Sequence, residues 1–429
     1  MQSLDILLPS DVFPPRTGGA GWSAFALARA LQDRGHRVTA LVPQRGIRGI
    51  SQRVENGVAV VDVGYRAPNV PFVANWARFE RFWPRFAQAI VAAAPADRGS
   101  LVIHGQHLQS IGAAVLAGAT LGVPMVATVR DHWPYHYFNT SLHGDNVPLD
   151  HFGAAAIATD LVARSGPLLG SLSVLALPYV LAHMQRRRAI LARCDAVISL
   201  SSYITRRLKP LVASARLHPI PNLVELTELD RVVATSPKTL IEGRFILFAG
   251  KLARNKGAHL LPEVMRSLRD AGGWATLVIA GGADAHLLHE IRAVGLPVLA
   301  LDWANHDEVL RLMSRCAALV FPSTWGEPLS RVLLEACAVG APIAAMPTGG
   351  TPDLLTDGVN ALLAPTATSL GWAVARLLAQ PQLAAHLSHG ARYTAEMRLA
   401  APVVAAQMEE VYRAVLAENT RRNAAARAG

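Results

Sequence analysis

The sequence predicts an α/β protein built from two doubly wound, parallel-sheet domains of Rossmann-like type. Short, almost continuously apolar runs alternate with longer helical patterns along most of the chain. Strands of a parallel sheet covered by helices on both faces have this pattern, because neither face of such a sheet meets water. The chain has 429 residues, which suits two or three domains at about 150 residues each.

The apolar runs fall into two series separated by a polar stretch. The expected strands of the first series are 4–9, 37–42, 58–62, 101–103, 124–129 and 196–199. Those of the second series are 244–250, 275–281, 297–301, 318–322 and 342–346. A run rich in Arg, Lys, Pro and polar residues between the series indicates a domain boundary.

These patterns give a specific domain division. We expect a first domain over 1–225 that contains an irregular insertion at 136–194, where no clear strand is visible. A linker over 226–243 and a second domain over 244–400 follow. The stretch 401–429 is expected to form a C-terminal helix that crosses back to the first domain and ends in a frayed tail.

Composition excludes several classes of protein. The chain is 51% hydrophobic and 17% charged, whereas disordered chains are rich in charge and poor in apolar residues. Its three cysteines are far apart, so we expect no disulfide framework and no cysteine metal site, and we infer a reducing, cytoplasmic location. The N-terminal stretch lacks the basic and long apolar regions of a signal peptide, so none is expected.

The net charge of +10 is unevenly distributed. Residues 1–240 hold 24 Lys and Arg against 15 Asp and Glu, while the remainder is almost neutral. A basic first half suggests an anionic partner such as lipid headgroups, nucleic acid or an acidic substrate. The alternative is that an arginine-rich composition reflects a GC-rich genome. Nucleic acid is not expected, because no recognisable module and no interleaving of aromatic and basic residues is present.

A glycine-rich loop follows the first expected strand and precedes a helix. Gly18 and Gly19 let backbone N–H groups approach a ligand, and a helix N-terminus attracts anions. The loop is not a G-x-G-x-x-G fingerprint, and no acidic residue follows the second strand, so a nicotinamide cofactor is not expected. The structural alternative is an ordinary glycine turn.

A second loop carries two lysines after the first strand of the second series. Gly250 and Lys251 begin it, and Lys256 follows five residues later. Two ammonium groups at the carboxyl end of a strand can hold a diphosphate. The alternative is a solvated turn.

The third loop, 322–331, follows the strand at 318–322 and places two glutamates eight residues apart. Glu327 lies in the loop, and Glu335 lies about two turns into the next helix on an apolar face, where a carboxylate needs a partner such as ribose hydroxyls. Backbone N–H groups at the helix start, over Leu329, Ser330 and Arg331, can bind phosphate.

These motifs resemble the retaining GT-B-fold glycosyltransferases of family 4, also called group 1. The segment 327–335 resembles the E-x7-E region, and it continues in register through 340–342, 349–353 and 357–360. The loop 249–257 resembles the family's G-R-L-x3-K-G element, with Lys251 where arginine is usual. Across the chain, the glycine opening, Gln106-His107 and the segment 220–225 are also similar, and the resemblance covers most of 1–135 and 195–400.

The resemblance implies a hexosyl- or other glycosyltransferase that moves a sugar from a nucleotide-diphosphate donor with retention at the anomeric carbon. The second domain would bind the donor and the first the acceptor, on either side of a cleft. No cofactor and no metal is implied, and no cluster with metal-ligand spacing is seen. Lys251 and Lys256 would stabilise the leaving diphosphate, Glu327 would bind donor-sugar hydroxyls, and Glu335 would bind the ribose.

In the first domain the resemblance implies that Gly18, Gly19 and His107 contribute to the substrate site. The sequence departs from the family pattern at Arg130, which stands where the family often has a histidine, although an R-D-x-W-P subgroup looks similar. Arg130 could stabilise phosphate or sugar oxygens but not act as a base near pH 7. Asp131 or His132 could take a polar role, or His132 could be only a loop residue. Ser330 and Leu223 replace glycines of the family pattern.

The apolar run 167–184 inside the insertion is the last unusual feature. It is short for a membrane span, and Arg186, Arg187 and Arg188 follow it. One hypothesis is that the run lies on the inner face of the plasma membrane, where a lipid-linked acceptor would be presented and the arginines would pair with anionic headgroups. The alternative is a buried core helix or a lid.

The sequence leaves the donor base, the sugar and the acceptor open. UDP-sugars and GDP-sugars are both candidates, and polysaccharide biosynthesis is one candidate setting. Two other interpretations of the same fold remain: a sugar-nucleotide epimerase, and a catalytically silent partner that binds a sugar nucleotide.

Overall fold

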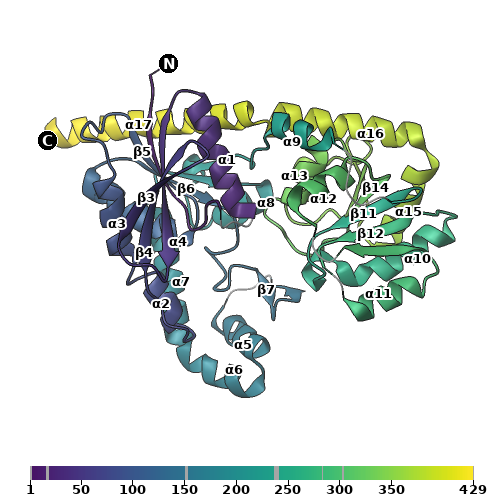
Figure 1. The fold of residues 1–429 in the computed structure, drawn as a ribbon. Coiled ribbons are helices and arrows are strands. Elements are labelled where there is room, and N and C mark those ends of the chain that lie inside the picture. Colours follow the sequence, from purple (N-terminus) through teal and green to yellow (C-terminus); the bar gives the residue numbers. More distant parts are fainter. Residues whose placement is uncertain are drawn as a thin grey trace. The chain divides into compact units, whose positions relative to one another are not determined.

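The computed structural model describes residues 2–15, 19–149, 153–235, 241–282, 284–301 and 304–428. The chain divides into two compact units. The first contains 1–144, 149–223 and 401–429, and the second contains 145–148 and 224–400. Each unit is an α/β domain with its own mostly parallel sheet, as predicted (Figure 1).

The first unit is built on an eight-stranded sheet with the order β10-β9-β6-β5-β1-β2-β4-β3. Its strands are β1 Asp5–Pro9, β2 Arg37–Arg45, β3 Ile50–Glu55, β4 Val58–Tyr65, β5 Leu101–Gly105, β6 Met125–Val129, β9 Ala196–Ser199 and β10 Leu217–Pro219. All neighbouring pairs are parallel except β3 and β4, which are antiparallel. The expected strands therefore exist, and β3 and β10 are additional edge strands.

Helices cover both faces of this sheet, and the insertion adds α5 and α6, which do not contribute to the two sheet cores. The helices of the unit are α1 Gly19–Asp33, α2 Val73–Arg78, α3 Trp83–Ala92, α4 Leu108–Leu121, α5 Ala154–Ser165, α6 Pro167–Ser173, α7 Leu177–Ala192, α8 Ser202–Leu208 and α17 Ala401–Ala428, with 3-10 turns at Val174–Ala176 and Ser214–Arg216. One core cluster lies between the sheet and α3, α4 and α8, and another lies between the opposite face and α1 and α17.

The C-terminal helix α17 packs on the first unit, as the sequence suggested. Tyr412 is fully buried, and its hydroxyl lies 2.6 Å from Nδ1 of His104 on β5. The other ring nitrogen of His104 lies 2.7 Å from the Thr128 hydroxyl on β6. Burial lowers the pKa of His104 to about 3, with a further contribution from the nearby positive charge of Arg130, so the imidazole is neutral in this contact.

The second unit holds a six-stranded, fully parallel sheet with the order β13-β12-β11-β14-β15-β16. The strands are β11 Phe245–Ala249, β12 Thr276–Ala280, β13 Val298–Leu301, β14 Ala318–Phe321, β15 Ile343–Ala345 and β16 Leu362–Leu363. The helices are α9 Leu226–Val233, α10 Leu261–Asp270, α11 Ala285–Arg292, α12 His306–Met313, α13 Arg331–Ala338, α14 Thr351–Leu354, α15 Ala367–Ala379 and α16 Pro381–Thr394. Shorter helical turns are Arg254–Lys256, Ala258–Leu260 and Ala395–Leu399.

Two segments differ from the expected domain division. The stretch 226–243 was expected to be a linker, but α9 begins it, and Leu229 and Val232 are buried in a core cluster of the second unit. Those apolar side chains recur at helical spacing, and their burial stabilises the helix as part of the domain. Residues 236–240 lie outside the described part of the chain.

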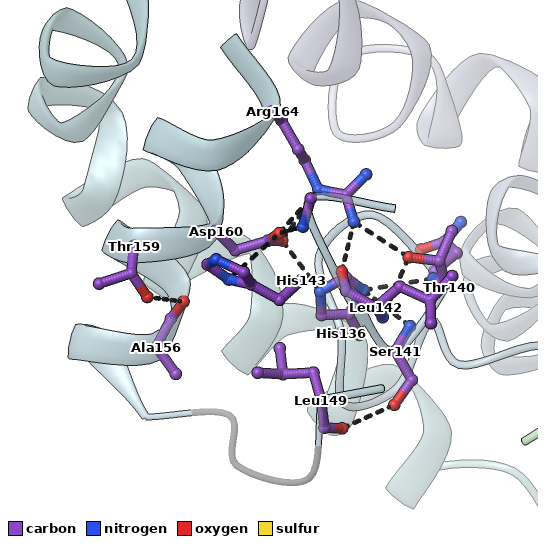
Figure 2. A network of polar contacts seen from close by, with 12 residues as sticks. His136, Thr140, Ser141, Leu142, His143, Leu149, Ala156, Thr159, Asp160 and Arg164 are labelled. Atoms are coloured by element: carbon purple, nitrogen blue, oxygen red, sulfur yellow. Dashed lines mark hydrogen bonds and ion pairs between the residues drawn. The ribbon is translucent and has the colours of Figure 1, made fainter. Parts of the chain in front are cut away.

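The insertion 136–194 was expected to be irregular, whereas most of it is helical, with α5, α6 and α7 joined by short turns. The short strands β7 Leu142–His143 and β8 Val147–Pro148 precede these helices. The polar network of Figure 2 ties α5 to the loop before it, with Asp160 at its centre. Its carboxylate accepts hydrogen bonds from Arg164 Nε at 2.9 Å and from the Gly144 backbone N–H at 2.7 Å, and it lies 3.2 Å from Nε2 of His136.

Burial alone would raise the pKa of Asp160, but the hydrogen bonds from His136, Gly144 and Arg164 outweigh it and lower the pKa. Asp160 is therefore an ionised anchor of the insertion.

Arg187 anchors α7 to the loop 133–139. Its side chain is 1% exposed, and its guanidinium donates to the backbone oxygens of Trp133 and His136, both at 3.1 Å, and to Asn139 Oδ1 at 3.0 Å. Arg186, by contrast, is half exposed and lies 3.2 Å from Glu80 Oε1. The expectation that all three arginines 186–188 face lipid headgroups is therefore wrong, because Arg187 is part of the core.

We predict that Arg187→Ala lowers the free energy of unfolding by about 3–5 kcal/mol, since it leaves several buried acceptors without a donor. The matched control is its neighbour, Arg186→Ala, for which we expect a loss of about 1 kcal/mol or less, as for an exposed ion pair. Urea unfolding followed by circular dichroism measures both. Equal losses in the two variants would contradict the structural role of Arg187.

Candidate functional site

The loops that follow β11 and β14 lie at the switch point of the second sheet. β11 is the strand whose neighbours, β12 and β14, lead in opposite directions along the chain. In open parallel sheets ligands bind outside the carboxyl ends of strands at such a point. The predicted residues Gly250, Lys251 and Lys256 follow β11, and Glu327 follows β14.

Glycines allow the backbones of neighbouring loops to touch at this edge of the sheet. Gly257 has φ +75°, and a Cβ there would lie 1.8 Å from the carbonyl oxygen of Pro322. A Cβ on Gly349 would lie 2.3 Å from the backbone oxygen of Glu327, and one on Gly281 would lie 2.0 Å from that of Gly250. Only glycine fits where two backbones approach so closely. The contacts fix where the side chains of the loops point.

Lys256 and Glu327 meet as a result. Lys256 Nζ lies 2.6 Å from Glu327 Oε1, and the Ser323 hydroxyl donates to the same oxygen at 3.2 Å. The ammonium group also lies 5.1 Å from the centre of the Trp325 ring, within range of a cation–π interaction. The structure thus brings together a lysine and a glutamate that are 71 positions apart. Lys251 is exposed.

Glu335 lies inside α13 and is almost completely buried. Nε of Arg331 donates to Glu335 Oε1 at 2.7 Å, and Nε2 of His306 lies 2.8 Å from the same oxygen. Burial raises the pKa of Glu335, but the hydrogen bond and charge of His306 and the charge of Arg331 outweigh it, and the net shift is downward. An ionised carboxylate is therefore held in the middle of this short helix.

The start of α13 presents backbone donors. Ser330 is its N-cap residue, and its side chain makes no capping hydrogen bond. The N–H groups of a first helical turn have no partner within the helix and attract anions. Leu329 packs against the hydrophobic core of this unit, which holds the loop in place.

The predicted residues of the first unit lie at the carboxyl ends of β1, β5 and β6. Gly18 lies outside the described residues, and Gly19 is the first residue of α1. The guanidinium of Arg130, just after β6, contacts Gln106 Oε1 and Asn222 Oδ1. Asp131 accepts a 2.8 Å hydrogen bond from the Trp133 backbone N–H.

His107 is the N-cap residue of α4. Its imidazole ring has unused hydrogen-bonding capacity that a ligand could take. Neither ring nitrogen has a hydrogen-bond partner among the described residues, although both atoms are buried. The carboxylate of Asp11 accepts instead from the first N–H groups of α4, at 3.1 Å from Gln109 and 2.8 Å from Ser110. Burial lowers the pKa of His107 to about 4, so the ring is neutral near pH 7.

The pKa of Asp131 is raised to about 7, chiefly because the surrounding protein desolvates its carboxyl, while the Trp133 hydrogen bond works in the opposite direction. A carboxyl with such a pKa can carry or release a proton near neutral pH. His132 is buried, and its Nδ1 contacts the Tyr135 hydroxyl of the same loop. This contact favours a structural role for His132 over a role in binding.

Sequence reasoning missed two residues of these clusters. His306 begins α12 and contacts Glu335 from 29 positions away, and no motif marks it. Asp11 follows β1, where an acidic residue after a strand was a usable signal, but its partner is the start of α4, 98 positions away.

In the described part of the chain, no three His, Cys, Asp or Glu side chains gather in a way that could hold a metal ion. One helical stretch, 168–192, has the length and composition to cross a membrane, with 22% of its most apolar window buried. That observation is weak by itself, because core helices of soluble proteins pass the same test.

Relatives of known name resemble parts of this chain. It is 33% identical over 168 residues to a D-inositol 3-phosphate glycosyltransferase of Saccharomonospora viridis, which is 35% of this chain and 38% of that one. It is 29% identical over 189 residues to an alpha-maltose-1-phosphate synthase of Mycobacterium tuberculosis, 40% of this chain and 48% of that one. The chain matches about half or less of the length of such curated relatives.

Solved structures share the fold over almost the whole chain. A structure of Anabaena Alr3699/HepE in complex with UDP matches with a TM-score of 0.64 and 16% identity, and covers 96% of this chain and 100% of that one. Sucrose-phosphate synthase from Thermosynechococcus elongatus matches with a TM-score of 0.66 and 20% identity, over 97% and 100%. Identities this low carry the fold alone, and that fold is GT-B.

Two family models account for most of the sequence. The model described as Glycosyltransferase Family 4 matches residues 17–228, and the model described as Glycosyl transferases group 1 matches residues 235–394. The second match contains both lysines and both glutamates of the loops after β11 and β14. The chain therefore belongs to the GT-B glycosyltransferases of the group 1 and family 4 type.

Proposed function

We propose that the protein transfers a sugar from a nucleotide-diphosphate sugar to an acceptor with retention of the anomeric configuration. The observation that carries the proposal is the pairing of Lys256 with Glu327 on the loops after β11 and β14. The buried, ionised Glu335 lies on α13, the helix that follows the second of these loops. A lysine, a carboxylate for hydroxyl groups and the backbone N–H groups at a helix start are the chemistry that a nucleotide-diphosphate sugar needs. The fold match to a UDP complex supports the same assignment.

Each residue takes a distinct part in the proposed reaction. Glu335 accepts hydrogen bonds from the ribose hydroxyls, with Arg331 and His306 holding its carboxylate in place. Lys256, Lys251 and the N–H groups at the start of α13 bind the diphosphate. As the glycosidic bond to the diphosphate breaks, negative charge grows on the leaving group, and these positive groups stabilise it. Glu327 orients both Lys256 and the hydroxyls of the donor sugar.

In the first unit, Arg130, Asp131 and His107 are proposed to contact the acceptor. Arg130 is always protonated near neutral pH, so its role is charge stabilisation and not proton abstraction. His107 offers two ring nitrogens without protein partners, which suits hydroxyl groups. Transfer assays with UDP-, GDP- and ADP-sugars test the proposal. Conversion of the donor to an epimer without release of nucleotide would instead indicate an epimerase, and binding without turnover a silent partner.

We predict that Lys256→Ala and Glu327→Ala each raise the activation free energy of turnover by about 2–4 kcal/mol. Each substitution removes a charge that acts on the transition state. The double variant should be slower by much less than the sum, since the two side chains contact each other. The control is Lys209→Ala, an exposed lysine of the first unit. Near-normal turnover of both single variants with intact folding would remove the assignment.

We also propose that the reaction needs no metal ion, because lysines and helix N–H groups supply the positive charge. Activity is therefore expected to survive EDTA, with no stimulation when Mg²⁺ or Mn²⁺ is added back. Initial rates in chelated and metal-supplemented buffer measure this. Loss of activity on chelation that Mg²⁺ or Mn²⁺ restores would overturn the proposal.

We further propose that the protein is cytoplasmic and rests peripherally on the inner membrane surface, where a lipid-linked acceptor is presented. The support is a stripe of four exposed leucines on α6 and the turn that follows, here called the leucine face. It consists of Leu168, Leu169, Leu172 and Leu175, which are 78%, 64%, 59% and 79% exposed. Spacings of one, four and seven residues place them on one side of the helix. Moving so apolar a face out of water lowers the free energy of the system.

The leucine face replaces the three arginines as the basis for membrane binding. We predict that Leu168→Gln, Leu172→Gln and Leu175→Gln together weaken co-sedimentation with anionic vesicles by about tenfold or more, because less apolar area is buried at the interface. The matched control carries Trp274→Gln, Val359→Gln and Trp372→Gln, three exposed apolar residues of the second unit.

Two results would contradict membrane binding by the leucine face. One is a wild-type protein that binds no vesicle at low salt. The other is an equal loss of binding in the leucine variant and in the matched control.

A further inference from the structure

A pocket on the first unit is lined by four arginines, far along the chain from the donor loops. This arginine pocket has a volume of about 420 Å³, within the range of about 300–1,000 Å³ that small-molecule sites have. Its arginines come from three separate segments and are Arg48, Arg66, Arg81 and Arg85.

No acidic side chain in the described part of the chain opposes these four arginines. All four are exposed, no carboxylate lines the pocket, and none of the four makes an ion pair or a hydrogen bond to an acidic side chain in the described part of the chain. The nearest acid in sequence is Glu80, whose carboxylate is held by His183 at 2.6 Å and by Arg186 at 3.2 Å. Four unopposed guanidinium groups around one small volume raise the local electrostatic potential and attract anions.

The backbone around the pocket is rigidly built. A Cβ on Gly64 of β4 would lie 2.5 Å from the backbone oxygen of Ile47, so the loop that carries Arg48 packs directly on that strand. Arg45 donates to the backbone oxygen of Ala67 at 2.9 Å and thereby holds the chain next to Arg66. Arg81 lies 5.8 Å from the centre of the Trp76 ring. The arginines are therefore presented by fixed segments, which lowers the entropic cost of binding.

The floor of the pocket is apolar. Tyr65, the last residue of β4, and Phe82, just before α3, are both buried, with ring centres 4.7 Å apart. Figure 1 shows α2 and α3 beside β4. Tyr65 ends β4, Arg81 and Phe82 lie in the turn between the two helices, and Arg85 lies on α3. An apolar floor under a guanidinium rim suits a phosphorylated molecule, whose phosphate oxygens take the rim while its organic part covers the rings.

We propose that the arginine pocket binds the phosphate or diphosphate group of a ligand that is distinct from the sugar donor. Arginine rather than lysine fits this task, because its planar fork donates two parallel hydrogen bonds to one phosphate. The loop with Lys251 and Lys256 belongs to the second unit, so the two sites can be tested independently. The pocket goes beyond the proposed transferase function and does not require it to be correct.

Calorimetric titration with inorganic pyrophosphate at low ionic strength tests the proposal. The background is the Lys251→Ala, Lys256→Ala protein, in which the donor loops hold no lysine. On this background we expect pyrophosphate to bind, and Arg66→Gln with Arg81→Gln to weaken binding by about 10- to 100-fold, as for lost charge-assisted hydrogen bonds. Arg66→Lys with Arg81→Lys keeps the charge without the fork and should give an intermediate loss.

The matched control on the same background is Arg98→Gln with Arg193→Gln, two exposed arginines that do not line the pocket. It should bind as the background does. No binding of pyrophosphate to the background protein would overturn the proposal, as would a change of less than about threefold on Arg66→Gln with Arg81→Gln, or an equal loss in the control. Because no turnover is measured, failure here leaves the transferase assignment untouched.

A second arm identifies where the phosphate comes from. Phosphatidylcholine vesicles containing phosphatidic acid are added to the pyrophosphate complex, with pure phosphatidylcholine vesicles as the blank. Displacement of pyrophosphate supports the pocket and assigns its ligand to a membrane headgroup. Undiminished binding supports the pocket and assigns its ligand to a soluble phosphorylated molecule.

Discussion

Close backbone contact at the carboxyl edge of the second sheet is the constraint on which the candidate donor site depends. A side chain at Gly257 would collide with the carbonyl of Pro322, and one at Gly349 would collide with the backbone of Glu327. With only hydrogen at these points, the loops after β11 and β14 lie against each other, and Lys256 reaches Glu327. The glycines of the sequence motifs thus act by removing volume, and the charged residues depend on them for their positions.

That constraint also explains what the sequence could and could not predict. Apolar runs predicted both parallel sheets, because a strand buried on both faces carries its own signal in its residues. The site loops were predicted from residues next to strand ends, which topology brings to one edge. The pairing of Lys256 with Glu327, and of His306 with Glu335, was beyond reach, because it depends on how loops far apart in sequence pack.

The structure of the insertion 136–194 was predicted less well than the two sheets. The segment that forms α5 to α7 shows no series of short apolar strands, so it was expected to be irregular, with a core helix over 167–184 as one alternative. What holds α5 is a local polar network around Asp160, and what holds α7 is the buried Arg187. Charged residues normally indicate surface, and only the full set of acceptors around a guanidinium reveals a buried one. Three consecutive arginines therefore gave a misleading indication of a membrane-facing cluster.

The arginines of the first half of the chain lie in different environments. Some arginines are structural: Arg187 is enclosed by backbone oxygens, and Arg37 is matched by Asp5 at 2.6 Å. Arg130, at the carboxyl end of β6, is held by the side-chain amide oxygens of Gln106 and Asn222. A composition bias alone would scatter unpaired arginines over the surface, whereas four of them line one rigid pocket with an apolar floor. Because like charges in one place cost free energy in the folded state, their gathering argues for a bound anion that offsets the cost.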